Sequence, residues 1–224
     1  MRPKICTVVS GNNLKEFLHN LEKVQCVSQM IELRVDHIKG LRIQDIKTIR
    51  SKIKKESIFT CRRSDEGGQF KGTEKERVEI INEALKLGFE HVDIELSTLE
   101  KDIINLPKMS RSRQIISYHN FQETPCESFL NSLIKRMKEF NHDIIKIATQ
   151  VNNDSDILNL CKLILNKKMD EKRIIIGMGE KGKGIRVVGP LLGSYLTYAS
   201  IDTKNAMLGQ LSLSELQSIY KSII

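Results

Sequence analysis

The chain has 224 residues, of which 40% are hydrophobic and 29% are charged. This length and mixture predict one globular domain over residues 1–224, with enough apolar side chains for a full core. Its formal net charge is +8, but the basic residues are scattered and only 5% of residues are aromatic. Scattered cations with few aromatic residues do not favour nucleic acid as a partner. No apolar run approaches the roughly 20 residues of a membrane span, so we expect no membrane partner either.

The cysteines and histidines exclude further classes. The five cysteines are odd in number, widely spaced and without a CxxC pair. They indicate reduced core thiols in a cytoplasmic protein rather than a disulfide framework or a zinc site. The five histidines show no HExxH or similar spacing, so we expect no metal and no other cofactor.

Short apolar runs alternate with amphipathic helical patterns along the chain. The predicted strands are Ile5–Val9, Met30–Val35, Ser57–Cys61, His91–Leu96, Gln114–Tyr118, Asp143–Ala148, Arg173–Met178 and Tyr195–Ile201. Between them, apolar residues recur at helical spacing, as in Ile43, Ile46, Ile49 and Ile53. Capping boxes predict helix starts at Thr73…Glu76, Ser97…Glu100 and Ser212…Glu215.

Eight strand–helix units in this order predict an α/β fold, the (β/α)8 or TIM barrel. An open doubly wound sheet is the alternative. It is disfavoured because Ser10-Gly11-Asn12-Asn13 follows the first strand, in place of a phosphate-binding GxGxxG.

Charged residues within barrel strands need a reason, because both faces of such a strand are covered. Five predicted strands carry them, mostly near the C-terminal ends, where barrel active sites lie. Lys146 alternates with Ile145 and Ile147, which places its side chain in the lumen. It is a buried partner of a carboxylate, a lysine on an edge strand, or a nucleophilic amine that attacks a carbonyl substrate.

Other polar residues gather at the same predicted edge. Glu32 and Arg34 share one strand face, as a structural ion pair or as a wall that binds substrate hydroxyls. Arg62 ends a strand, and Gly67-Gly68 lets the following loop fold over the barrel mouth. His119 at a strand end predicts an imidazole that transfers protons.

The segment Met178-Gly179-Glu180-Lys181-Gly182-Lys183-Gly184-Ile185-Arg186 follows the seventh strand. Its glycines and cations are typical of a phosphate or carboxylate cradle, and equally of a plain flexible loop. Together, a lumen lysine, a histidine, a glutamate and several arginines indicate a carbonyl substrate with anionic or hydroxyl groups.

In this order along the whole chain, these segments resemble type I 3-dehydroquinate dehydratases. The resemblance rests on Glu32-Leu33-Arg34-Val35-Asp36, Thr60-Cys61-Arg62 with Glu66-Gly67-Gly68, Asp93-Ile94-Glu95-Leu96, Ser117-Tyr118-His119-Asn120-Phe121, Lys146-Ile147-Ala148, Met178 with Arg186, and Gly209-Gln210. It implies a lyase of the shikimate pathway that converts 3-dehydroquinate to 3-dehydroshikimate and water through a lysine Schiff base. The expected partner is this small-molecule substrate, with a homodimer as one option.

The resemblance also implies a role for each matching residue. Lys146 would attack the ring ketone, His119 would transfer protons, and Glu66 would orient His119. The expected substrate-binding residues are Glu32, Arg34 and Arg62 for the ring hydroxyls, Arg186 for the carboxylate, Gln210 on a closing loop, and Met178 and Tyr198 as walls of the ring site.

The closing loop departs from the family pattern. The family usually reads Ser-Ala-Pro-Gly-Gln where this chain has Ala206-Met207-Leu208-Gly209-Gln210. A serine contact to substrate is therefore not carried over, and without proline the loop is less rigid before closure. We expect Gln210 to be anchored only on the side of the Ser212…Glu215 capping box.

Two other functions stay open at the level of sequence. Another class I Schiff-base barrel enzyme, such as an aldolase, would share the strand lysine but not the set of Glu32, Arg34, Arg62 and Arg186. A non-enzymatic module that binds anionic ligands or RNA would leave Lys146 unexplained.

Overall fold

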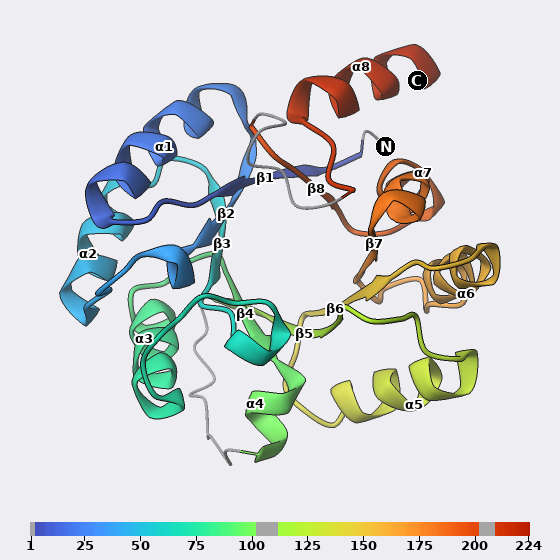
Figure 1. Ribbon diagram of the computed structural model, residues 1–224, viewed down its shortest axis with the longest axis horizontal. Coiled ribbons are helices and arrows are strands. Elements are labelled where there is room, and N and C mark those ends of the chain that lie inside the picture. Colours follow the sequence, from blue (N-terminus) through green and yellow to red (C-terminus); the bar gives the residue numbers. More distant parts are fainter. Residues whose placement is uncertain (1–2, 102–111, 202–208) are drawn as a thin grey trace. The chain divides into compact units, whose positions relative to one another are not determined.

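The computed structural model describes residues 3–101, 112–201 and 209–224. The chain divides into two compact units. The first unit is Val8–Ile116, and the second unit is Met1–Thr7 together with Ser117–Ile224. In each unit, parallel strands alternate with helices (Figure 1).

The first unit is built around three parallel strands. Its elements are α1 (Leu14–Val27), β2 (Met30–Arg34), η1 (Val35–His37), α2 (Ile43–Lys52), β3 (Glu56–Thr60), η2 (Ser64–Glu66), α3 (Glu74–Lys86), β4 (His91–Glu95) and α4 (Leu96–Lys101). The register places Arg34 beside Thr60, and Thr60 beside Asp93. The C-terminal ends of these strands therefore carry their polar side chains to one common edge.

The second unit repeats the pattern. Its elements are the second half of β5 (Arg113–Asn120), which begins in the first unit, then α5 (Glu127–Met137), β6 (Ile144–Gln150), α6 (Asp154–Leu165), β7 (Arg173–Met178), η3 (Glu180–Gly182), α7 (Lys183–Leu192), β8 (Thr197–Ala199) and α8 (Leu213–Ile223). β1 (Ile5–Val9) pairs with β8 through Ile5–Thr7, and β6 pairs with β7, both in parallel. The order of elements is that of a (β/α)8 barrel.

Local sequence accounts for most helix starts. The Thr73 and Ser212 boxes are confirmed, and Asn153 forms another with Asp156. The box predicted at Ser97 is wrong, because α4 begins at Leu96 directly after β4 and Ser97 lies inside its first turn.

Buried apolar residues fill the space between strands and helices. In the first unit the largest include Phe17, Ile46, Phe59, Leu85 and Phe89, each fully buried. One predicted core position differs, since Ile43 is 43% exposed at the start of α2.

The prediction of core thiols is also only partly right. All five cysteines are free, but Cys26 and Cys126 are exposed, whereas Cys6 and Cys61 are buried. Within the part of the chain that the structure describes, no helix has both the length and the apolar character needed to cross a membrane.

Candidate active site

Arg34 ends β2, and its side chain is held by Asp36, two residues later in the sequence. Its Nε and Nη2 donate to the two carboxylate oxygens of Asp36 at 2.9 and 2.8 Å, and Nη2 also reaches the carbonyl of Gly67 at 3.4 Å. Burial disfavours both charges, but the attraction and the hydrogen bonds between the two side chains outweigh the effect of burial. The pKa of Arg34 is therefore raised and the pKa of Asp36 is lowered. Asp36 therefore fixes the direction of the Arg34 guanidinium.

Arg62 follows β3 and lies between two carboxylates of β4. Its Nη2 is 2.8 Å from Asp93 Oδ2, and its Nη1 donates to Glu95 Oε1 at 2.7 Å. All three side chains are at most 3% exposed. Although burial disfavours the cation, the two carboxylates hold the pKa of Arg62 well above its ordinary value. Arg62 is thus permanently charged and tightly placed.

Glu66 is placed by a sharply folded loop. Gly67 has a φ of +80°, and a side chain on Gly68 would collide with the carbonyl oxygen of Arg62, 2.0 Å from its Cβ. The loop therefore folds back on the end of β3 in a way that only glycine allows, as predicted. Ser97, wrongly expected to cap a helix, donates to Glu66 Oε1 at 2.7 Å.

Burial raises the pKa of the Glu66 carboxyl to about 7, with the Ser97 hydrogen bond opposing the shift and the nearby charge of Glu95 adding to it. A group that changes charge near neutral pH is suited to work beside a proton-transferring residue. Its negative charge is also costly to the fold, which gives a test that needs no substrate.

We expect Glu66→Gln to change how stability depends on pH. The pKa is raised from 4.5 to about 7 on folding, so wild-type stability should fall as pH rises through that window. The variant lacks this loss, and its advantage in free energy of unfolding should grow by about 2 kcal/mol between pH 5 and pH 8. Urea unfolding at both pH values measures it, with the exposed Glu79→Gln as control. An advantage that does not change with pH would contradict a raised pKa.

Lys146 lies in β6 of the second unit and is only 4% exposed. Its Nζ is 4.6 Å from the ring centroid of Tyr198, itself buried on β8. The aromatic face gives the amine a partly apolar environment beside an attractive π surface. His119 lies within β5, which extends to Asn120, two residues beyond the predicted end, and it is half-buried.

Arg186 in α7 is a buried cation. It is 5% exposed, and its Nε has no hydrogen-bond partner among the described residues. Burial alone lowers the pKa of Arg186 to about 10. A desolvated guanidinium of this kind offers an unusually strong site for an anionic group. Met178, at the end of β7, is also buried.

The closing loop is described only from Gly209 onward, so the departure at Ala206-Met207-Leu208 lies outside the described residues. Gly209 has a φ of +78°, and a Cβ there would lie 2.1 Å from the carbonyl oxygen of Gly179. The backbone of Ser200 donates to Leu211 at 3.1 Å on the other side of Gln210. Gly209 therefore packs closely against Gly179, and Leu211 is hydrogen-bonded to Ser200. The expectation that Gln210 is anchored on one side only stays a prediction, because residues 202–208 lie outside the described residues.

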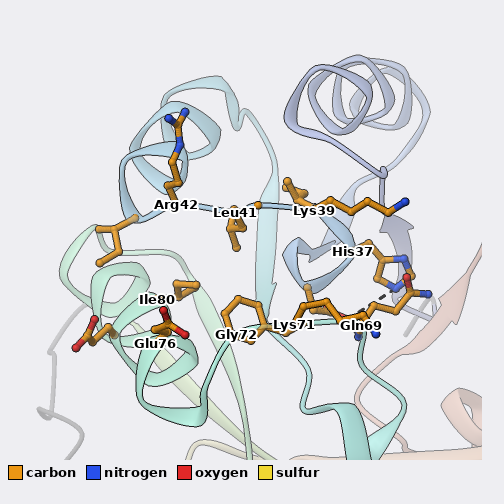
Figure 2. A pocket seen from close by; sticks show the side chains of 15 residues that line it. His37, Lys39, Leu41, Arg42, Gln69, Lys71, Gly72, Glu76 and Ile80 are labelled. Carbon is orange, nitrogen blue, oxygen red and sulfur yellow. Dashed lines mark hydrogen bonds and ion pairs between the residues drawn. The ribbon is translucent and has the colours of Figure 1, made fainter.

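A separate hollow of about 520 Å³ opens in the first unit (Figure 2). It lies between residues 36–43 and residues 69–72, and Leu41 points across it. Asp36 lines the hollow and also binds Arg34, whereas Glu32, Arg62 and Glu66 are not lining residues. The hollow adjoins the candidate site through Asp36 without being part of it.

Within the first unit, the structure places four predicted site residues as buried side chains: Glu32 within β2, Arg34 at its end, Arg62 just after β3 and Glu66 in η2. Within the second unit it places His119, Lys146, Met178, Arg186, Tyr198 and Gln210. The sequence interpretation missed the residues that hold them, namely Asp36, Arg77 and Ser97. Asp36 could have been found from its spacing of two from Arg34 at the end of a strand.

The strand–helix repeats, the buried strand lysine and the buried arginines define a class of proteins, the barrel enzymes with a lysine on a strand. The model of the type I 3-dehydroquinase family matches residues 5–224. The chain is 40% identical over 219 residues to a 3-dehydroquinate dehydratase of Coxiella burnetii, covering 98% of this chain and 93% of that protein. It is 34% identical to that of Methanocaldococcus jannaschii, covering 97% of each.

A crystal structure of type I 3-dehydroquinate dehydratase from Clostridium difficile, with covalently modified comenic acid, matches with a TM-score of 0.88 at 28% identity, over 99% of this chain and 92% of that one. The chain belongs to the type I 3-dehydroquinase family, hydro-lyases of the shikimate pathway that convert 3-dehydroquinate to 3-dehydroshikimate and water. The predicted barrel fold, family and activity are thus confirmed.

Proposed function

We propose that Lys146 is the residue that forms the Schiff base and that His119 transfers the protons. The observation that carries the proposal is the burial of Lys146 on a strand, against the ring of Tyr198. Its Nζ would add to the ring ketone, and the ketone oxygen would leave as water to give an imine. The imine then withdraws electrons from the neighbouring carbon, which makes its proton acidic.

The remaining steps need one group that both accepts and donates a proton. His119 would take the α-proton, leaving an enamine, and would return a proton to the β-hydroxyl as the C–O bond breaks and water departs. Water then adds to the product imine, which releases 3-dehydroshikimate and the free amine of Lys146. Glu66 would orient His119 in its ionised form, which a pKa of about 7 makes available near neutral pH.

The other site residues would bind the substrate. In the first unit, Glu32, Arg34 and Arg62 would hold the ring hydroxyls, since each is buried and fixed in direction. In the second unit, Arg186 would pair with the substrate carboxylate. Its burial supports this role, as does its Nε, which has no hydrogen-bond partner in residues 3–101, 112–201 and 209–224. Met178 and Tyr198 would form walls, and Gln210 would close the site from its loop.

Borohydride trapping tests the proposal. Reduction during turnover should convert the imine into a stable secondary amine, and mass spectrometry of peptides should find the ligand on Lys146. The same incubation without substrate, or without borohydride, provides the control. An adduct on another lysine, or none during active turnover, would show that Lys146 is not the nucleophile.

We also propose a cytoplasmic location, which the free thiols of all five cysteines support because such thiols persist in a reducing compartment. A homodimer stays a prediction from sequence, for sedimentation velocity to test.

A further inference from the structure

A chain of buried charges runs from Arg62 into helix α3. Arg62 contacts Asp93 and Glu95, which are two residues apart on β4 and therefore face the same side of the strand. Glu95 uses its second oxygen, Oε2, to accept from Nη1 of Arg77 at 2.8 Å. Among the residues that the structure describes, Arg77 is the largest fully buried side chain, at 1% exposure, although it lies on a helix.

Each nitrogen of the Arg77 guanidinium has a partner. Besides Glu95, Nη1 donates to the carbonyl of Cys61 at 2.5 Å, the residue directly before Arg62. Nε and Nη2 donate to Glu74 at 2.8 and 2.6 Å, and Nη2 also reaches Thr98. Arg77 therefore holds both the backbone that leads to Arg62 and the carboxylate that binds it. A planar fork is needed for this set of contacts, and an ammonium cannot reproduce it.

The charges of the four buried side chains in this network balance. Arg62 and Arg77 are positive, Asp93 and Glu95 are negative, and none is more than 3% exposed. Without Arg77, two carboxylates would face one guanidinium in a poorly screened interior. Arg62 would then be drawn toward Glu95, and the excess negative charge would act on Glu66, whose carboxyl already responds to Glu95 and Arg62.

We propose that Arg77 is a positioning residue of the dehydration: by holding Glu95 and the Cys61 carbonyl, it places Arg62 for the ring hydroxyls and balances the charge beside Glu66. The inference rests on the roles proposed above for Arg62 and Glu66. Arg77 touches no substrate in this scheme, and its effect reaches the reaction through two intervening contacts.

Two substitutions separate geometry from charge. Arg77→Lys keeps the charge but loses the fork, so it should raise KM about tenfold, the effect of one weakened hydrogen bond to substrate, with kcat nearly unchanged. The acid limb of its kcat/KM profile should stay in place. Arg77→Met also removes the charge, so its acid limb should move to higher pH by about half a unit or more, because a less positive surrounding disfavours ionised Glu66.

Arg173→Met is the matched control. Arg173, at the start of β7, is also a buried arginine, 5% exposed. It donates to Glu171 and to the carbonyl of Leu163. The Arg173→Met variant should be less stable than wild type, with no change in KM or in the pH profile of kcat/KM. Glu66→Gln identifies the limb, since that variant should lack it.

The outcomes divide cleanly. If both Arg77 variants lose stability but keep KM and the acid limb within error of wild type, as Arg173→Met should, the role of Arg77 is purely structural and the inference is wrong. If Arg77→Met does not fold, the KM of Arg77→Lys decides alone: a raised value supports the inference and an unchanged one overturns it. Arg62→Lys is measured in parallel. If it leaves KM unchanged, the role proposed for Arg62 has failed, and the inference falls with it for that separate reason.

Discussion

His119→Ala is expected to lower kcat by about 10²–10⁴, the usual contribution of a general acid–base group, with a much smaller change in KM. The variant can still form the imine slowly, but it lacks the group that removes the α-proton and protonates the leaving hydroxyl. Imine complexes should therefore accumulate, and borohydride should trap more of them than in wild type. The absorbance of the conjugated product measures turnover, and peptide mass spectrometry measures trapping.

His142→Ala is the control for this prediction. His142 precedes β6, is also half-buried, and its Nδ1 lies 2.8 Å from the carbonyl of Phe140. Its replacement should leave turnover near wild type. Near-normal turnover in His119→Ala would instead assign the proton transfers to another residue.

Arg186→Met is expected to move stability and binding in opposite directions. Removing this buried guanidinium should raise the melting temperature of the unliganded protein, because burial disfavours its charge and its Nε has no hydrogen-bond partner within the described part of the chain. Loss of the charged pair with the substrate carboxylate should raise KM on the order of 10²–10³-fold. Thermal unfolding and steady-state kinetics measure the two effects.

The contrast with Arg173→Met makes the first effect specific. Arg173 is equally buried, but its Nε and Nη1 donate to Glu171 and to the carbonyl of Leu163, so its loss should lower the melting temperature. If Arg186→Met is destabilised in the same way, Arg186 serves the fold rather than an anion, and its proposed role is wrong.

Much of the fold could be predicted because the strands are short apolar runs that stand out between the amphipathic helical patterns. β1 and β7 have the predicted bounds, β2 and β4 end one residue earlier than predicted, and β3 is shifted by one residue at both ends. β5 and β6 each run two residues further than predicted at their C-terminal ends. β8 is shorter, at Thr197–Ala199 instead of Tyr195–Ile201. Flanking backbone groups there bond outside the strand, as Tyr195 N does to Arg173 O at 2.7 Å.

The candidate site was predicted less completely, since its supporting contacts are long-range. Ser97 fits the pattern of a helix cap, but β4 passes into α4 without a loop, and the hydroxyl is left for Glu66, 31 residues earlier. Arg77 precedes the apolar residue Val78 on a charged helix and looks like a surface residue. Only the folded chain shows that it reaches Glu95, because no local pattern encodes a contact between a helix and a strand 18 residues away.

The balanced chain of Arg62, Asp93, Glu95 and Arg77 has an evolutionary consequence. Any single replacement that changes a charge leaves an unmatched ion in the interior, which destabilises a protein by about 3–5 kcal/mol. That is a large part of the total stability of an ordinary domain. Lineages should therefore keep or exchange these positions together, and intermediates with one altered member should be rare. Among homologous chains, Arg77 and Glu95 should covary even where the exposed face of α3 has diverged freely.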